Sequence, residues 1–456
     1  MSIIDDVQNS SMTRFQKVTI AACLAVMVVD GFDVIAMSFA AHYVADDWAI
    51  SSSTLGYVLS ASTAGMALGS LVLSPIADRY GRRIVALGGL ATAAIGMLYT
   101  AFAGSVEHLL ASRAITGIGV GGIMVTTGII IAEYSSRRRL GLTMALFSTA
   151  NGVGGVLGGL LAKAIIPAFG WHAVFLFGGA ATAVFLVVAF FAIPESLDYL
   201  VTRDDPKSVR RHEQIASKMG RPIGTREPRQ KTSTVAIGAK FRYSDLFAGR
   251  TGLHTAFLTL GFGTLMATFY FVLGWTAQLV AVATGSGEVG IQVATLLPLG
   301  GIVGAIAFGL LTGIIATRPL SIAALSLASI STFAMAYTIA TGSAPIVSAL
   351  ILGILLTAGI TSFYGIIPLA FPSQLRATGF GFVLGVGRII GIIAPIGAGY
   401  LLGFTSSATV YSLAGALVGV SAIVIAIYFF FTRNDSPVCD LPVVRVVAED
   451  EQRTGA

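Results

Sequence analysis

The stretch VVDGFD, residues 28–33, lies deep within the first long apolar run of the chain, 18–44. Asp30 and Asp33 are three positions apart, so on a helix they share one face. An acid at the middle of a bilayer costs about 2.5–3.5 kcal/mol on insertion scales, and ionisable groups at that depth usually face a functional cavity. The alternative is a pair of acids satisfied by serine hydroxyls and backbone inside a helix bundle. We therefore expect a membrane helix whose acids serve the function.

The composition is that of an integral membrane protein. The chain has 456 residues, of which 55% are hydrophobic and only 11% are charged, whereas soluble domains have about 25% charged residues. The N-terminal residues are polar and lack a signal-peptide pattern, so the first apolar run is expected to remain as a membrane helix. The two cysteines, Cys23 and Cys439, fall in the first run and near the C-terminus, and we expect no disulfide between them.

Apolar runs of about 20 residues are long enough to span a bilayer, and the sequence contains twelve of them. The predicted fold is therefore an all-α membrane protein with twelve transmembrane helices in two six-helix bundles. The expected spans are 18–44, 52–77, 84–103, 107–132, 140–166, 171–193, 251–281, 288–316, 319–341, 345–370, 376–403 and 408–432.

The basic residues fix the expected orientation. Of 28 Lys and Arg residues, 25 fall in segments on one side of the predicted spans, and the other three (Arg113, Lys163 and Arg388) lie within spans. Because cytoplasmic loops are enriched in Lys and Arg, both termini are expected in the cytoplasm. The net charge of +6 comes from these loops, so nucleic acid is not an expected partner. The predicted parts are a cytoplasmic N-terminus (1–17), an N-terminal bundle (18–193), a linker loop with a short amphipathic helix (194–250), a C-terminal bundle (251–432) and a cytoplasmic tail (433–456).

The loop between the second and third spans reads SPIADRYGRR, residues 74–83. This resembles the cytoplasmic loop signature of the major facilitator superfamily, with Ser74 in place of the usual first glycine. We expect the Asp78 carboxylate to cap a helix N-terminus across the bundle interface and the arginines to pair with acids, chiefly Glu133. The matching loop of the second half has Gly313 where the repeat would place the acid, so its gating role is expected to be weaker. The residues assigned to this cytoplasmic gate are Asp78, Arg79, Gly81, Arg82, Arg83 and Glu133.

Two arginines lie within spans and need an anion, because a buried charge must be paired. Arg113 opens the fourth span in RAITGIGVGG, which resembles a superfamily motif, and Arg388 lies near the middle of the eleventh span. Either could bind a substrate carboxylate, and either could pair structurally with Asp30 or Asp33. Arg388 is the stronger candidate for the substrate, because the spans of the second half contain no acid at its depth. Glu288, at the outer start of the eighth span, is too shallow.

Aromatic side chains offer a wall for a ring-shaped substrate. The candidates are Phe269 and Trp275 in the seventh span and Tyr364 in the tenth. Packing and lipid contact are the commoner reasons for such clusters. Two further resemblances are weak: residues 151–159 to a glycine-rich motif of superfamily antiporters, and Pro194-Glu195-Ser196 to a signature of sugar and organic-acid transporters.

Together, residues 30–33, 78–83, Arg113 and Arg388 resemble the aromatic acid:proton symporter family within the major facilitator superfamily. The resemblance covers essentially all twelve spans. It implies import of a benzoate, hydroxybenzoate or gentisate-type carboxylate with a proton by alternating access, with proton coupling at Asp30 or Asp33. It also implies a monomer in the cytoplasmic membrane of a bacterium, in contact with lipid.

Other functions remain as alternatives. The chain could import another organic anion such as muconate, or it could export drugs or metabolites against a proton gradient. A receptor is disfavoured because the predicted parts include no substantial domain outside the membrane. The sequence shows no ATP-binding motif, catalytic triad or metal-ligand pattern, so we expect no enzyme activity, no cofactor and no metal, with the proton as the coupling ion.

Overall fold

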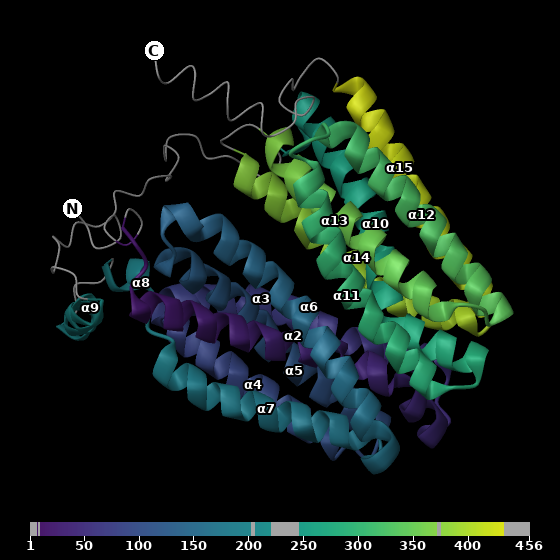
Figure 1. The fold of residues 1–456 in the computed structure, drawn as a ribbon, viewed down its shortest axis with the longest axis horizontal. Coiled ribbons are helices and arrows are strands. Elements are labelled where there is room, and N and C mark those ends of the chain that lie inside the picture. The colour runs from purple at the N-terminus through teal and green to yellow at the C-terminus, as the bar shows by residue number, and fades with distance from the viewer. Residues whose placement is uncertain (1–6, 8–9, 202–205, 220–245, 372–374, 433–456) are drawn as a thin grey trace. The chain divides into compact units, whose positions relative to one another are not determined.

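The computed structural model describes residues 7, 10–201, 206–219, 246–371 and 375–432. Twelve helices there are long and apolar enough to cross a membrane (Figure 1), which confirms the predicted all-α fold. These helices are α2 (Arg14–Trp48), α3 (Ser52–Tyr80), α4 (Arg82–Ala101), α5 (Val106–Tyr134), α6 (Arg137–Phe169), α7 (Trp171–Ala192), α10 (Gly249–Thr284), α11 (Gly287–Leu311), α12 (Thr317–Thr341), α13 (Pro345–Ala370), α14 (Arg376–Leu402) and α15 (Ser407–Phe431). Two shorter helices, α8 (Leu197–Val201) and α9 (Pro206–Lys218), follow α7.

The helices extend past the apolar runs from which they were predicted. The first run covers 18–44, whereas α2 begins at Arg14 and ends at Trp48. Helical hydrogen bonding does not stop where the apolar side chains stop, so polar turns at both ends continue the helix into the headgroup region. The amphipathic helix expected in the linker is present as α9.

The chain divides into two compact units. The first contains Met1–Met37 with Ala61–Ile237, and the second contains Ser38–Ser60 with Gly238–Ala456. The adjoining ends of α2 and α3 therefore belong with the C-terminal helices. Within that second unit, the Ser38 hydroxyl donates to the Leu273 carbonyl at 2.8 Å, and the hydroxyls of Tyr57 and Tyr400 lie 3.0 Å apart.

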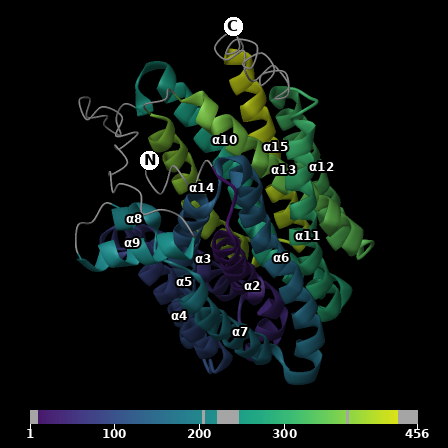
Figure 2. The ribbon, with the colours of Figure 1, turned by 60° about the vertical axis from the view of Figure 1, so that its left-hand side comes forward.

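The same helix pairings occur in both halves of the sequence (Figures 1 and 2). The third span packs against the fourth and the sixth: α4 against α5 and α7, and α12 against α13 and α15. The first packs against the fifth, and the second against the fourth, in each half. This repetition confirms the expected pseudo-symmetric arrangement of two six-helix repeats.

Glycines allow the helix carrying the acids to approach its neighbour. A Cβ atom on Gly31 would overlap the carbonyl oxygen of Asn151 in α6, and one on Gly154 would overlap the carbonyl oxygen of Val28. The Phe32 ring fills the space that Gly158 leaves open. Small residues let membrane helices pack closely, so the VVDGFD stretch is held against α6 by its own glycine and phenylalanine.

Candidate substrate and proton sites

The two acids of α2 are buried in the N-terminal unit. Asp30 is 2% exposed and Asp33 is 1% exposed. Asp30 Oδ2 accepts a long hydrogen bond from Asn151 Nδ2 at 3.4 Å, and Asp33 Oδ2 accepts one from the Thr182 hydroxyl at 3.3 Å. The Oδ1 atom of each acid has no hydrogen-bond partner among the described residues. An unsatisfied buried polar atom usually indicates a functional role or a bound water or ion, and an unoccupied carboxylate oxygen is a position where a proton can bind.

Arg113 is enclosed beside these acids, with no exposed surface. Its Nη2 atom donates to the backbone carbonyl of Asp33 at 2.7 Å and its Nη1 atom to the Met97 sulfur at 3.2 Å. The guanidinium also lies 5.5 Å from the centroid of the Phe175 ring. Within the described part of the chain, no carboxylate oxygen lies at ion-pair distance from Arg113. Arg113 therefore holds α2 by donating to its backbone, while its charge also interacts with the Asp33 carboxylate.

Arg388 lies among aromatic side chains of the C-terminal unit. It is half-buried, and its charge interacts with the phenols of Tyr270 on α10 and Tyr364 on α13. The Tyr364 ring is 6.2 Å from that of Phe262 and 6.3 Å from that of Phe380, measured between centroids. Tyr364 is 46% exposed, so this cluster presents a cation, hydroxyl groups and ring faces at an accessible position.

The two aromatic residues predicted to form a wall in the seventh span, Phe269 and Trp275, lie in different environments. Phe269 is partly exposed, and its ring lies 5.5 Å from that of Tyr270, beside the Arg388 cluster. Trp275 is 1% exposed, and its indole N–H donates to the Pro395 carbonyl at 3.0 Å. Because an indole N–H satisfied inside the unit has no donor left for a ligand, Trp275 packs the core of its unit in this conformation.

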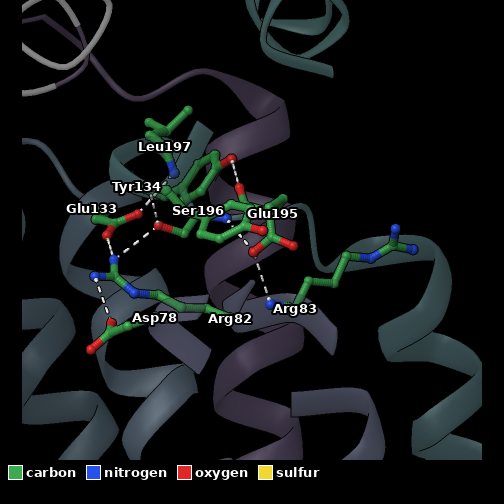
Figure 3. A network of polar contacts seen from close by, with 9 residues as sticks. Asp78, Arg82, Arg83, Glu133, Tyr134, Glu195, Ser196 and Leu197 are labelled. Carbon is green, nitrogen blue, oxygen red and sulfur yellow. Dashed lines mark hydrogen bonds and ion pairs between the residues drawn. The ribbon is translucent and has the colours of Figure 1, made fainter. Parts of the chain in front are cut away.

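The loop between α3 and α4 forms a polar network (Figure 3). Arg82 pairs with Glu133 of α5 and lies 3.9 Å from the Asp78 carboxylate, measured between Nη2 and Oδ1. Arg82 also donates to the Ser196 hydroxyl at 2.9 Å, and Glu133 accepts from the backbone N–H of Leu197 at 2.9 Å. The network therefore joins the loop and α5 to the first residues after α7.

Glu195 caps the N-terminus of α4. Glu195 is 3% exposed, and its Oε1 atom accepts from the backbone N–H of Arg83, in the first turn of α4, at 3.0 Å. A carboxylate at a helix N-terminus is stabilised by the helix dipole. Asp78 is exposed and its described ion pair is with Arg82, and its capping of a helix across the bundle interface stays a prediction. Arg79 is also exposed, with its guanidinium 5.3 Å from the Tyr80 ring centroid.

The structure adds residues that the sequence analysis did not assign to a site. They are Asn151 and Thr182 beside the acids, Tyr270 beside Arg388, and Glu195 and Ser196 in the loop network. The Pro-Glu-Ser resemblance was the available signal for the last two. Neutral polar residues in apolar spans carried no comparable signal.

Gly81 is required by this geometry, which gives a testable prediction. Its φ of 111° and ψ of 144° place it in a region open essentially only to glycine, and a Cβ atom would lie 2.5 Å from Glu195 Oε2. Gly81→Ala is expected to cost about 2–3 kcal/mol of stability, lowering the thermal midpoint of the detergent-purified protein. Gly88→Ala, within α4, is the control, because nothing lies within 4 Å of its Cβ position. Equal midpoints for the two variants would contradict this account of Gly81.

The matching loop of the second half is organised differently. Arg318, at the start of α12, is 7% exposed and donates to the Thr432 carbonyl at 3.1 Å. Its guanidinium also lies 5.7 Å from the Phe429 ring centroid. Arg318 thus contacts a backbone carbonyl and a ring, whereas Arg82 in the first half pairs with carboxylates.

No group of three His, Cys, Asp or Glu side chains in the described segments is placed to hold a metal ion. A hollow of about 480 Å³ in the C-terminal unit is lined by α10, α14 and α15. Its lining includes Val386 and Ile390, which flank Arg388 on the opposite face of α14, and no charged residue. This hollow is therefore not the anion site.

Comparison with known proteins identifies related chains. A family model described as the Major Facilitator Superfamily matches residues 21–346. A 4-hydroxybenzoate transporter of Pseudomonas aeruginosa is 29% identical over 85% of this chain and 86% of its own length. A gallate transporter of Pseudomonas putida is 28% identical over 88% of this chain and 89% of its own. An inward-open structure of the xylose transporter of Escherichia coli superposes with a TM-score of 0.72 at 15% identity, covering 89% of this chain and 94% of that one. These matches are membrane transporters, which confirms a transporter rather than an enzyme.

Proposed function

Because the chain belongs to the Major Facilitator Superfamily, we propose that it imports an aromatic carboxylate of the benzoate, hydroxybenzoate or gentisate class together with a proton. The observation that carries the proposal is the Arg388 cluster. It combines a half-buried guanidinium, the phenols of Tyr270 and Tyr364, and the surrounding rings. An arginine matches the geometry of a carboxylate, and ring faces stack on an aromatic substrate. The names of the related transporters support this substrate class.

The proton-binding groups in this proposal are Asp30 and Asp33. Both are buried and each keeps one oxygen without a hydrogen-bond partner among the described residues. Protonation of one acid removes its repulsion toward an arriving carboxylate. A proton and an anion that cross together carry no net charge, which lowers the free-energy cost of moving them through the membrane. Arg113 fixes the helix that carries these acids by donating to the Asp33 carbonyl.

Transport in this proposal follows alternating access, in which the substrate site opens to one side of the membrane and then to the other. The Asp78–Arg82–Glu133 network belongs to the gate at the end where α4 begins. The distribution of Lys and Arg supports a cytoplasmic position for that end and for both termini. We place the protein, as a monomer, in a bacterial cytoplasmic membrane.

Competition for uptake tests the proposed substrate class. Cells that express the protein are given labelled 4-hydroxybenzoate at acidic external pH, with and without a protonophore. Accumulation is expected to stop with the protonophore and to be inhibited by benzoate and gentisate. The uncharged 4-hydroxybenzamide is expected to inhibit far less, because it keeps the ring but offers Arg388 no carboxylate.

Two results would contradict the proposal. Stronger inhibition by muconate than by any benzoate would identify a different organic anion as substrate. Energy-dependent loss of label from preloaded cells, without accumulation, would identify an exporter. Vector-only cells and membrane detection of the protein are the controls.

A further inference from the structure

A second site lies in the N-terminal unit, away from the acids of α2. It is a cavity of about 150 Å³ at the end of the unit where α7 finishes and α8 and α9 follow (Figures 1 and 2). Its lining comes from the start of α2, the start of α4, the end of α7 and one face of α9. The lining residues are Phe15, Arg83, Phe191, Ala192, Ile193, Pro194, Glu195, Arg211, Gln214, Ile215 and Lys218.

Helix α9 is fixed in the orientation that makes this cavity basic. Ile215, Ala216 and Met219 are buried in the core cluster of the unit, together with Leu197 and Leu200. Arg211 and Lys218 are seven residues apart, so they lie on the same face of α9, and both are exposed. The apolar contacts of α9 therefore present two cations to the cavity.

The floor of the cavity adds a third cation. Arg83 Nε is buried and has no hydrogen-bond partner among the described residues, while its Nη2 atom donates to the Phe190 carbonyl. Glu195 also lines the cavity, but its Oε1 atom already accepts the backbone N–H groups of Arg83 and Ser196. Glu195 Oε2 is buried without a hydrogen-bond partner among the described residues. Three cations thus outnumber one carboxylate, which leaves the cavity with a net positive charge.

The rim of the cavity is apolar and continues the surface of a membrane helix. Phe191 is 82% exposed, in the last turn of α7, and neighbouring Phe190 is 54% exposed. A free phosphate ion makes no favourable contact with an apolar rim, whereas the acyl chains of a lipid can pack against it. The distribution of Lys and Arg assigns this end of the helices to the cytoplasmic headgroup region, where basic pockets bind anionic lipid headgroups.

We propose that this cavity binds the headgroup of an anionic phospholipid, with the phosphate diester held by Arg83, Arg211 and Lys218 and the acyl chains lying along Phe191. The site shares Arg83 and Glu195 with the loop network, but none of its residues lies beside the acids of α2 or beside Arg388. Its occupancy can therefore be measured without any transport assay.

The test is lipid binding followed by native mass spectrometry. The full-length protein in mild detergent is titrated with dioleoyl phosphatidylglycerol, with dioleoyl phosphatidylcholine, and with inorganic phosphate. The test variant is the double substitution Arg211→Gln with Lys218→Gln. The matched control, Arg138→Gln with Arg139→Gln, removes the same charge from exposed positions at the start of α6. All four substituted side chains are exposed, and thermal unfolding checks that both variants are folded.

We expect one tight phosphatidylglycerol site in the parent and the control. Losing two surface cations should weaken that site on the order of 30-fold in the test variant, with little retention of phosphatidylcholine by any form. Equal loss in the two double variants, or unchanged binding in the test variant, would overturn the proposal. Displacement of the lipid by inorganic phosphate at similar concentration would also overturn it, because the site would then be one for free phosphate.

Discussion

Replacing the proton-binding acid of α2 with asparagine is expected to abolish accumulation of the aromatic carboxylate while preserving exchange. Each of Asp30→Asn and Asp33→Asn keeps the side-chain shape and removes one titratable group. A pH gradient of one unit is worth about 1.36 kcal/mol per proton, or tenfold accumulation. In the variant that loses the coupling group, the ratio of internal to external substrate concentration is expected to fall from about ten to about one.

The measurement uses proteoliposomes with an imposed pH gradient, acidic outside. Exchange of internal unlabelled for external labelled substrate is measured in parallel, because it requires the substrate site but no net movement of protons. Thr182→Val is the matched control: it removes the hydrogen bond to Asp33 Oδ2 and leaves both carboxyls in place. It is expected to retain most of the accumulation. Full tenfold accumulation in both asparagine variants would remove these acids from proton coupling.

The sequence was sufficient for the fold because the bilayer constrains it strongly. A membrane helix must be apolar over about 20 residues, and its flanking charges report orientation. The linker helix α9 was predictable for a similar reason, since its apolar residues recur at helical spacing. The membrane spans and the linker helix both depend on local composition, so they can be predicted without knowing which helices contact one another.

The contacts within the sites depend on packing between distant segments. Glu195 follows α7, and only its close approach to the start of α4 makes it the cap of that helix. Arg113 was expected to pair with an acid or a substrate carboxylate. Its charge does interact with Asp33, but its hydrogen bonds go to a backbone carbonyl and a sulfur. Trp275 is an aromatic residue of the kind that could stack on a ring-shaped substrate. In the structure its indole N–H instead donates to the Pro395 carbonyl inside the unit.

Removing the guanidinium of Arg388 is expected to raise the KM for 4-hydroxybenzoate about 100-fold. A hydrogen bond to a charged group contributes about 1.5–3 kcal/mol, and the bidentate pairing of arginine with a carboxylate lies at the upper end. Arg388→Gln removes both the charge and the paired donors. Arg388→Lys keeps the charge but loses the planar pair of donors, so its KM is expected to lie between those of the parent and Arg388→Gln.

Tyr364→Phe separates the hydroxyl from the ring in the same cluster. The ring faces toward Phe262 and Phe380 are kept, and loss of one neutral hydrogen bond is expected to raise KM by roughly three- to tenfold. Initial rates of uptake over a range of substrate concentrations give KM and the maximal rate for each variant. If Arg388 binds the carboxylate, KM is expected to be lowest in the parent, higher in Tyr364→Phe and highest in Arg388→Gln. An unchanged KM in Arg388→Gln, with a lower maximal rate alone, would instead assign Arg388 to the conformational change, because substrate binding would then not depend on its charge.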